Sequence, residues 1–298
     1  MKRKRRLKKS FKRTLFILII SVILFIYAYP YLNSIELNAD GSLIINRNDI
    51  LNNSEDDSVY DSISSEKSNV GTIKERLKKL SKEDKRINKI LDNYNEYPEQ
   101  LLDMLSRNIG MIDFVLEYPE KNGKIFSETI GEIKKGTFPL LLQWDTRWGY
   151  GKYGDNNVAI SGCAPTALSM VIAGLTGKNN ITPYDIAKYS EEEGYYLTGT
   201  GTSWDLMTLG IKYFGIEGKE IPLTKNNVYR ALESGNPIIC SMGKGDFTTT
   251  GHFIVLVGIE NNKIKINDPN SVERSSVLWE YERIEYQIKN LWEFTISN

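Results

Sequence analysis

The hydrophobic residues of this chain follow different patterns along its length, and the first pattern is an uninterrupted apolar run. Residues 14–35 contain no charged side chain and number about 22, enough to cross a hydrocarbon core of about 30 Å. Nine Lys or Arg residues lie within residues 1–13, and Tyr27, Tyr29 and Tyr31 lie at the far end. Positive flanks stay in the cytoplasm, and aromatic rings favour the interface. The pattern predicts a basic cytoplasmic tail, a single-pass anchor in the cell membrane and an extracellular remainder.

A cleaved signal peptide is the alternative interpretation of the apolar run. The run is long for a signal peptide, and Ala28-Tyr29-Pro30 matches a small-residue cleavage site poorly. We therefore expect the anchor to be retained and the C-terminal bulk of the chain to be held outside the membrane.

Two more polar regions follow the apolar run. Residues 36–71 are rich in Asn, Ser and Asp and bury little apolar surface, which predicts a flexible linker. In residues 72–135, apolar side chains recur near helical spacing among many charges, with a break at Pro98. We expect a small helical region there, folded as a hairpin that packs on the next domain or acts as a spacer.

An apolar helix with a cysteine at its start is predicted further along the chain. Pro165 favours the first turn of a helix because its missing N–H is not needed there. Apolar residues after Pro165 form a buried helical face, and Gly174 or Gly177 can end the helix. Cys163 then lies at the helix N-terminus, where free N–H groups and the macrodipole stabilise a thiolate and can bind an oxyanion. The alternative for a lone cysteine is a small buried hydrophobic residue.

The chain has one histidine, His252, at the start of the apolar strand His252–Gly258, and a second strand ends at Asp268. Pairing Ile254 with Ile266 aligns the apolar residues and places His252 opposite Asp268 on one face. This register predicts a three-residue loop at residues 259–261. Asp268 can then orient the imidazole, and His252 can activate Cys163. The alternatives are a strand-end histidine without a catalytic role and an aspartate that forms a turn before Pro269.

The composition of the chain narrows the classes of partner and cofactor that it could bind. The 38 Lys and Arg balance the 38 Asp and Glu, so residues 14–298 carry a net charge of −9 once the basic tail is set aside. That split does not favour nucleic acid as the main partner. One histidine excludes a multi-His metal centre, and Cys163 and Cys240 lack CxxC spacing, so we expect no metal or other cofactor. Cys240 lies in an apolar run and is predicted to be a buried strand residue.

Several motifs together resemble bacterial papain-like peptidases related to the double-glycine leader peptidases of bacteriocin export. The motifs are Gln143-Trp144-Asp145 with Trp148, Gly162-Cys163 with Pro165-Thr166, Gly251-His252-Phe253 and Asn267-Asp268-Pro269. The resemblance implies an α+β, papain-like fold over residues 136–298, with an N-terminal catalytic helix packed on an antiparallel sheet. It also implies a Cys163–His252–Asp268 triad with Gln143 at the oxyanion hole; the alternative for Gln143 is a surface loop residue.

These observations predict a membrane-anchored, extracytoplasmic cysteine peptidase that acts on a peptide or protein, cell-wall peptides included. The chain also resembles secreted or anchored Gram-positive members of the family, which implies a Gram-positive bacterium. The leader peptidases are cytoplasmic domains fused to ATP-driven transporters, whereas this chain has no phosphate-binding loop and one apolar run. The double-glycine leader is therefore not carried over as its substrate. Two alternatives stay open: transfer of the acyl group to an amine, giving exchange or crosslinking, and an anchored binding module without activity.

Overall fold

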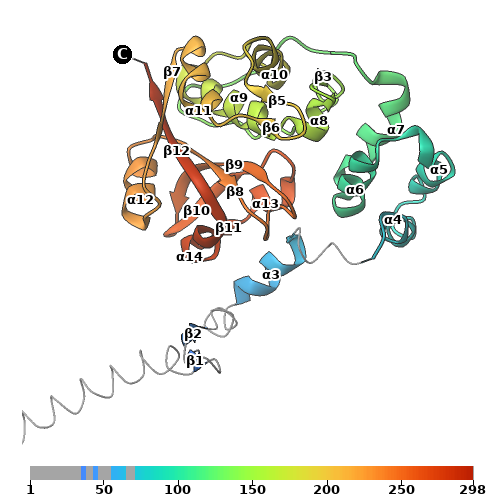
Figure 1. Cartoon of the computed structure of the whole chain (residues 1–298), viewed down its shortest axis with the longest axis horizontal. Helices are drawn as coiled ribbons and strands as arrows, with labels where there is room; N and C mark the ends of the chain where they lie inside the picture. Colours follow the sequence, from blue (N-terminus) through green and yellow to red (C-terminus); the bar gives the residue numbers. More distant parts are fainter. Residues whose placement is uncertain (1–34, 38–42, 46–54, 65–70, 298) are drawn as a thin grey trace, which may run out of the picture. The chain divides into compact units, whose positions relative to one another are not determined.

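A computed structural model of the chain describes most of it, and residues 63–298 form one compact unit. The described residues are 35–37, 43–45, 55–64 and 71–297. In the other unit, residues 1–62, strand β1 (Ile35–Leu37) pairs antiparallel with β2 (Leu43–Ile45), and helix α3 (Glu55–Ile63) follows (Figure 1). The range predicted as a flexible linker, 36–71, thus includes β2 and α3.

The predicted membrane anchor falls almost wholly outside the described residues. Residues 14–34 of the predicted span are not described, and Ile35 begins β1. Among the residues that the structure does describe, none of the helices combines the length and the apolar character needed to cross a membrane.

Four short helices form the region that follows, so the predicted two-helix hairpin is wrong. They are α4 (Ile73–Leu80), α5 (Ile87–Asp92), α6 (Glu99–Arg107) and α7 (Ile112–Lys121). The additional breaks come from polar side chains that bond to nearby main-chain groups: Asp84 Oδ1 accepts from the N–H of Arg86, and Asn108 Oδ1 accepts from the N–H of Gly110. Such local bonds favour helix ends over helix interiors.

The core of these four helices continues into the rest of the chain. Its buried residues include Leu101, Leu105 and Phe114 together with Tyr150 and Ala159 from beyond the helices. The Phe114 and Tyr150 rings stack with centroids 4.1 Å apart, and the Tyr150 hydroxyl donates to the carbonyl of Phe114. The helical region is therefore packed on the next part of the chain, as one of the two predicted arrangements had it.

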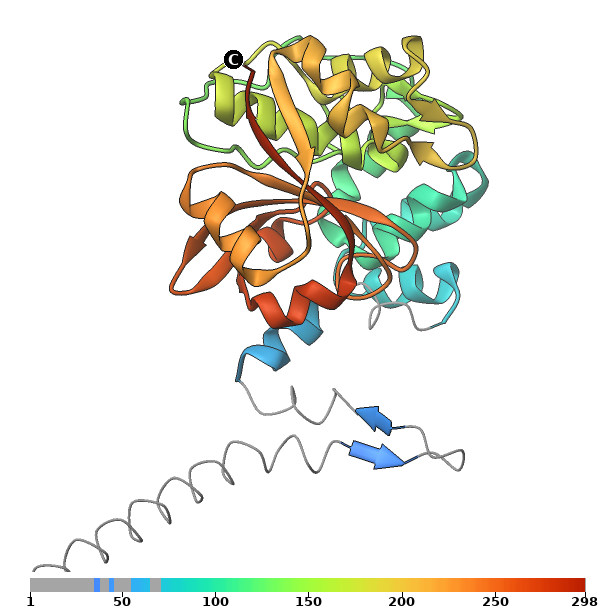
Figure 2. The same ribbon diagram turned by 60° about the vertical axis from the view of Figure 1, so that its left-hand side comes forward.

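A six-stranded sheet forms the centre of the remaining structure, with every neighbouring pair antiparallel (Figures 1 and 2). Its strands, in spatial order, are β11 (Leu278–Trp279), β10 (Lys263–Asn267), β9 (His252–Glu260), β8 (Ile238–Met242), β12 (Ile288–Ile296) and β7 (Ile216–Glu220). Two small hairpins lie outside the sheet: β3 (Lys152–Tyr153) with β4 (Asn156–Asn157), and β5 (Tyr196–Leu197) with β6 (Gly201–Thr202).

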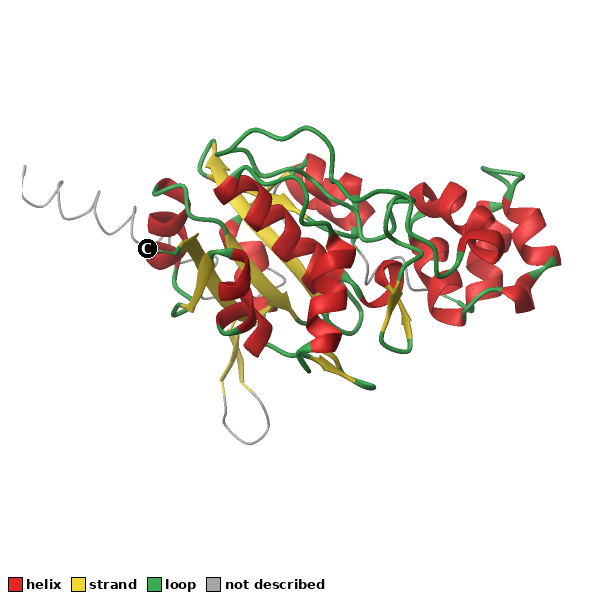
Figure 3. Cartoon of the chain, turned by 90° about the horizontal axis from the view of Figure 1, so that it is seen from above, coloured by secondary structure: helices red, strands yellow, loops and turns green. Residues whose placement is uncertain are grey.

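The helices of this part pack on the sheet or on one another, as the view coloured by secondary structure shows (Figure 3). They are α8 (Val158–Ser161), α9 (Cys163–Thr176), α10 (Pro183–Glu192), α11 (Asp205–Thr208), α12 (Lys225–Glu233), α13 (Val272–Ser276) and α14 (Tyr281–Ile284). Short 3₁₀ turns occur at Tyr94–Glu96, Ile109–Met111, Gly210–Phe214 and Glu285–Gln287.

Helix α9 packs on one face of the sheet and is buried along most of its length. Its Ala167, Leu168 and Val171 share a cluster with Val255 of β9 and Trp292 of β12. Large aromatic and branched side chains in this cluster remove much apolar surface from water, which is the main term that holds the layers together. The predicted α+β architecture, a cysteine-bearing helix on an antiparallel sheet, is confirmed.

Candidate active site

Cys163 is the first residue of α9, as the sequence predicts. Gly162 precedes the helix, and a Cβ there would lie 2.4 Å from the Val158 carbonyl oxygen, so the close turn into the helix requires glycine. Pro165 occupies the first turn, and Gly177, with a φ of 78°, ends the helix. The first N–H groups of a helix lack intrahelical acceptors, so those of Cys163 and Ala164 are placed to bind an anion beside the thiol.

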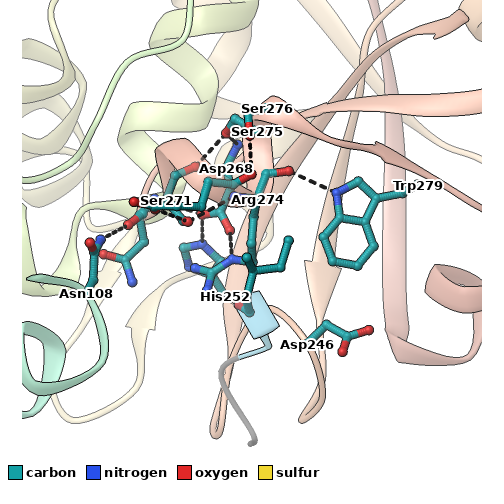
Figure 4. A network of polar contacts seen from close by, with 12 residues as sticks. Asn108, Asp246, His252, Asp268, Ser271, Arg274, Ser275, Ser276 and Trp279 are labelled. Atoms are coloured by element: carbon teal, nitrogen blue, oxygen red, sulfur yellow. Dashed lines mark hydrogen bonds and ion pairs between the residues drawn. The ribbon is translucent and has the colours of Figure 1, made fainter. Parts of the chain in front are cut away.

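His252 and Asp268 form a buried hydrogen bond of 2.7 Å between Nε2 and Oδ1 (Figure 4). His252 begins β9, and Asp268 directly follows β10. The side chain of His252 is 8% exposed and that of Asp268 is fully buried. Burial in a low-dielectric surrounding strengthens such a bond, and it fixes which ring nitrogen faces the carboxylate.

The predicted register of the hairpin is wrong, although the observed register also brings His252 and Asp268 to one face of the sheet, as expected. The turn contains two residues, Asn261 and Asn262, both with positive φ (51° and 62°), which the tight primed turn requires. With this turn a regular ladder would pair Ile266 with Val257, but Val257 is an extra, unpaired residue in β9, so Ile266 pairs with Leu256. This β-bulge shifts the alternation by one residue, so Asp268 returns to the face of His252.

Arg274 holds the second oxygen of the Asp268 carboxylate. Its Nε donates to Asp268 Oδ2 at 2.6 Å, and the Asn270 N–H donates to Oδ1 at 2.7 Å. Burial alone raises a carboxyl pKa, but the Arg274 guanidinium and the His252 ring outweigh it and hold the pKa of Asp268 well below its usual range. The carboxylate therefore stays ionised and keeps its orientation toward the imidazole.

The surroundings of His252 favour the protonated ring. Burial lowers its pKa, but the charge and hydrogen bond of Asp268 and a hydrogen bond with Cys163 together raise the pKa of His252 to about 9. Because Nε2 bonds to Asp268, Nδ1 is the ring nitrogen left to face the Cys163 sulfur. The His252 ring thus bonds to the Asp268 carboxylate and lines the same cavity as Cys163.

Gln143 is buried beside these residues rather than exposed on a loop. It is 3% exposed, and its Nε2 donates one hydrogen to the Ala159 carbonyl at 2.6 Å. A primary amide carries a second N–H on the same nitrogen. Gln143 and Cys163 line the same cavity, so this second N–H is available for an oxyanion held at the start of α9.

One cavity of about 150 Å³ is lined both by predicted site residues and by residues from segments that the sequence did not indicate. Gln143, Cys163 and His252 line it, while Asp268 lies behind the ring. Its other lining residues are Met104, Arg107, Asn108, Ile160, Phe247, Thr248, Thr249, Thr250, Gly251, Asn270 and Arg274.

Contacts across the sequence hold the walls of this cavity. Asp246, at the start of the loop that leads to His252, forms two 2.9 Å bonds with Arg283 and accepts from Gln287 Nε2 at 2.8 Å. Paired donors of this kind fix a carboxylate in orientation as well as position. The loop that carries the three threonines is therefore fixed to the C-terminal part of the chain.

Sequence reasoning missed Arg274, the cleft contribution of α6 and the bulge. A buried ionised carboxylate needs more than one partner, so an arginine soon after Asp268 was a usable signal for Arg274. The pair Asn261-Asn262 also indicates a two-residue turn, which sequence reasoning rejects because on a regular ladder it would place Asp268 on the face opposite His252; the bulge at Val257 removes that conflict. The contribution of α6 rests on contacts distant in sequence, for which no local pattern exists.

Cys240 lies in β8 and is fully buried, as predicted. Burial raises the pKa of the Cys240 thiol. Both cysteines are free thiols. Within the described residues, no group of three or more His, Cys, Asp or Glu side chains is arranged to hold a metal ion.

Comparison with known proteins matches residues 135–295 to the Peptidase_C39 like family. Among solved structures, the peptidase domain of Streptococcus ComA, a bi-functional ABC transporter involved in a quorum sensing pathway, is 24% identical with a TM-score of 0.37. The match covers 54% of this chain and 100% of that one. A protein described as a C39-like peptidase from Bacillus anthracis is 16% identical with a TM-score of 0.35, covering 55% and 98%. No curated protein matches the chain.

Proposed function

The chain belongs to the Peptidase_C39 like family and is a cysteine peptidase, and we propose that it hydrolyses peptide or isopeptide bonds through a Cys163–His252–Asp268 triad. One observation carries the triad: the His252 ring bonds to Asp268 through Nε2 at 2.7 Å, and Cys163, which contributes to the raised pKa of the ring, lines the same cavity. A nucleophile, a base and an orienting carboxylate in this order are the parts that covalent hydrolysis needs.

The first half of the reaction forms a thioester. The Cys163 thiolate attacks the carbonyl carbon of the substrate, and the carbonyl oxygen becomes an oxyanion. The Cys163 N–H and the second Nε2 hydrogen of Gln143 bind that oxyanion. The His252 imidazolium gives its proton to the leaving amine, the C–N bond breaks, and the acyl group stays on the sulfur.

The second half regenerates the free enzyme. Neutral His252 takes a proton from a water molecule, which attacks the thioester carbonyl. The C–S bond breaks, the acid product leaves, and the thiolate and imidazolium are restored. Asp268 remains ionised throughout and stabilises the ring whenever it is charged. An amine in place of water would give the exchange reaction, but no contact in the cavity favours it.

The experiment that tests the triad uses peptide libraries and the full chain. We expect Cys163→Ala to abolish cleavage and Cys240→Ala, which alters the other thiol, to retain it. Mass spectrometry of the wild-type protein quenched during turnover should find the acyl group on the peptide that contains Cys163. Cleavage that survives in Cys163→Ala would refute the mechanism.

We also propose that residues 14–35 anchor the enzyme in the cell membrane with the catalytic part outside. The support is the uncharged run with nine basic residues before it. In intact cells, a membrane-impermeant amine reagent should label lysines of the catalytic part, and the protein should sediment with membranes. Replacing Ile19 and Ile23 with Asp should release it, whereas replacing both with Leu should not. Sedimentation unaffected by the Asp pair would contradict the anchor.

A further inference from the structure

Helix α6 forms one wall of the catalytic cavity, although it lies outside the residues matched to the peptidase family. Met104, Arg107 and Asn108 line the cavity with Cys163 and His252. The end of α6 is bonded to both sides of the site. Arg107 Nη1 donates to Thr249 Oγ1 at 2.8 Å, and Asn108 Nδ2 donates to the Asn270 carbonyl at 2.6 Å. Its position in the cavity is therefore fixed by two independent contacts.

The charged side chains around the cavity carry a net positive charge. Of the described residues that line it, two are arginines, Arg107 and Arg274, and none is Asp or Glu. The neighbouring carboxylates are already engaged: Asp103 pairs with both Arg76 and Arg107, and Asp268 pairs with Arg274 and His252. Three guanidinium groups, those of Arg76, Arg107 and Arg274, therefore face the carboxylates of Asp103 and Asp268.

Arg107 is the arginine that can meet a ligand with this excess charge. A guanidinium has five N–H donors. Three contacts engage Arg107, namely Nε with the Asp103 carbonyl, Nη1 with Thr249 and Nη2 with the Asp103 carboxylate. One N–H remains on each of Nη1 and Nη2, and the side chain keeps 17% of its surface exposed. Burial and the charges of Arg76 and Arg274 lower the pKa of Arg107, so an anion placed there would relieve unfavourable interactions.

We propose that Arg107 is a specificity-determining residue that binds a carboxylate of the substrate close to the cleaved bond. The inference rests on the proposed function, because it concerns substrates cleaved at Cys163. The carboxylate belongs either to an Asp or Glu side chain or to the C-terminus of a short peptide. Both sources present the same planar group, which two N–H donors of a guanidinium can grip.

The test compares matched peptides cleaved by the wild-type protein. One arm uses pairs that differ only by Glu or Gln at each position flanking the bond, and the other uses pairs that end in a free acid or an amide. We expect kcat/KM to be about tenfold higher for the acid member of at least one pair, as for a charge-assisted hydrogen bond. The arm that shows the preference identifies the source of the carboxylate.

Substitutions then assign the preference to Arg107. In Arg107→Gln the ratio between acid and neutral peptides should fall to about one, and in Arg107→Glu it should fall below one. Arg107→Lys should keep part of the ratio, because lysine retains the charge without the fork. The matched control is Arg86→Gln, which removes an exposed arginine of the same helical region that does not line the cavity; its ratio should equal that of the wild type.

The ratio of kcat/KM between acid and neutral peptides, measured on a single variant, does not depend on how much of that variant is folded. Titration of Cys163 with a thiol probe gives the active fraction. A wild type that cleaves through Cys163 but shows no acid preference in either arm overturns this inference and leaves the proposed function standing. A preference that persists in Arg107→Gln also overturns it. A wild type whose cleavage does not depend on Cys163 refutes the proposed function, and the inference with it.

Discussion

The two cysteines of this protein occupy neighbouring elements of one domain and yet have opposite chemical prospects. Cys163 begins a helix, lines a cavity and contacts an imidazole held by a carboxylate. Cys240 lies in the adjacent sheet, where it pairs with Ile254 while Met242 pairs with His252. By strand alternation Cys240 therefore shares a sheet face with the histidine, two pairs farther along the ladder. It is nevertheless fully buried.

The difference shows that closeness to a histidine along a sheet does not make a cysteine reactive. Strand β8 is buried along its whole length, and its main-chain N–H groups are engaged in the ladder. A thiolate there would lack both solvation and donors, which is why burial raises the pKa of Cys240. A helix N-terminus has N–H groups without intrahelical acceptors, whereas the N–H groups inside a sheet are already hydrogen-bonded to the neighbouring strands.

The largest expected contrast is in thiol reactivity. In the folded protein at pH 7, a small alkylating reagent should modify Cys163 at least about a thousandfold faster than Cys240, because the buried thiol reacts only through opening of the structure. Peptide mapping by mass spectrometry over a time course measures both rates. Comparable rates under native conditions would remove the distinction between the two environments.

The next effect comes from the carboxylate that separates the Cys163 environment from that of Cys240. Asp268→Asn should lower kcat/KM about a hundredfold or more, since an amide stabilises the charged ring far less and can select the wrong tautomer. Asp246→Asn is the matched control, a buried aspartate in a guanidinium pair that does not touch His252. It should cost stability with a much smaller loss of kcat/KM per folded molecule. Equal losses of kcat/KM in both variants would show that Asp268 does not act on His252 in catalysis.

The pH profile should follow the raised pKa of His252. The ring is protonated in the free enzyme up to about pH 9, so kcat/KM should fall on the alkaline side near that pH as the proton donor is lost. The raised pKa also means that the protonated ring stabilises the fold fully below about pH 6.5 and that this contribution is lost as the pH rises through about 9. In Asp268→Asn the alkaline limb should move to lower pH. A limb that stays in place would contradict the assignment to His252.

The smallest effect expected is from the second cysteine. Cys240→Ser should leave kcat/KM per folded molecule close to wild type but lower the free energy of unfolding by about 1–3 kcal/mol, because a hydroxyl is buried without a designed partner. Cys240→Ala, which leaves only a small cavity, should be the milder change. Denaturant unfolding measures the stability difference, and a large activity loss in either variant would show that β8 contributes to the chemistry.

Local signals allowed the sequence to indicate the helix start at Cys163 and to limit its end to Gly174 or Gly177, because glycine and proline have strong backbone preferences; the structure ends the helix at Gly177. The single histidine left no other candidate base. Prediction failed at the bulge, because Val257 is unpaired only in the context of its partner strand. Four helices replace the expected hairpin because the local helix breaks at Asp84 and Asn108 were not recognised. Arg107 reaches the site through packing of distant segments. The anchor at 14–35 stays a prediction.

The bulge at Val257 has a consequence for how this hairpin can change in length. Each residue added to or removed from the paired part of either strand shifts the pairing register by one and exchanges the two faces for everything beyond it. Deleting Val257 alone would therefore turn the Asp268 carboxylate away from the ring. The turn at Asn261 and Asn262 lies outside the ladder, so it can lengthen without moving either side chain to the other face. A chain that keeps this site can thus vary the turn freely, but it can vary the paired strands only by even numbers of residues.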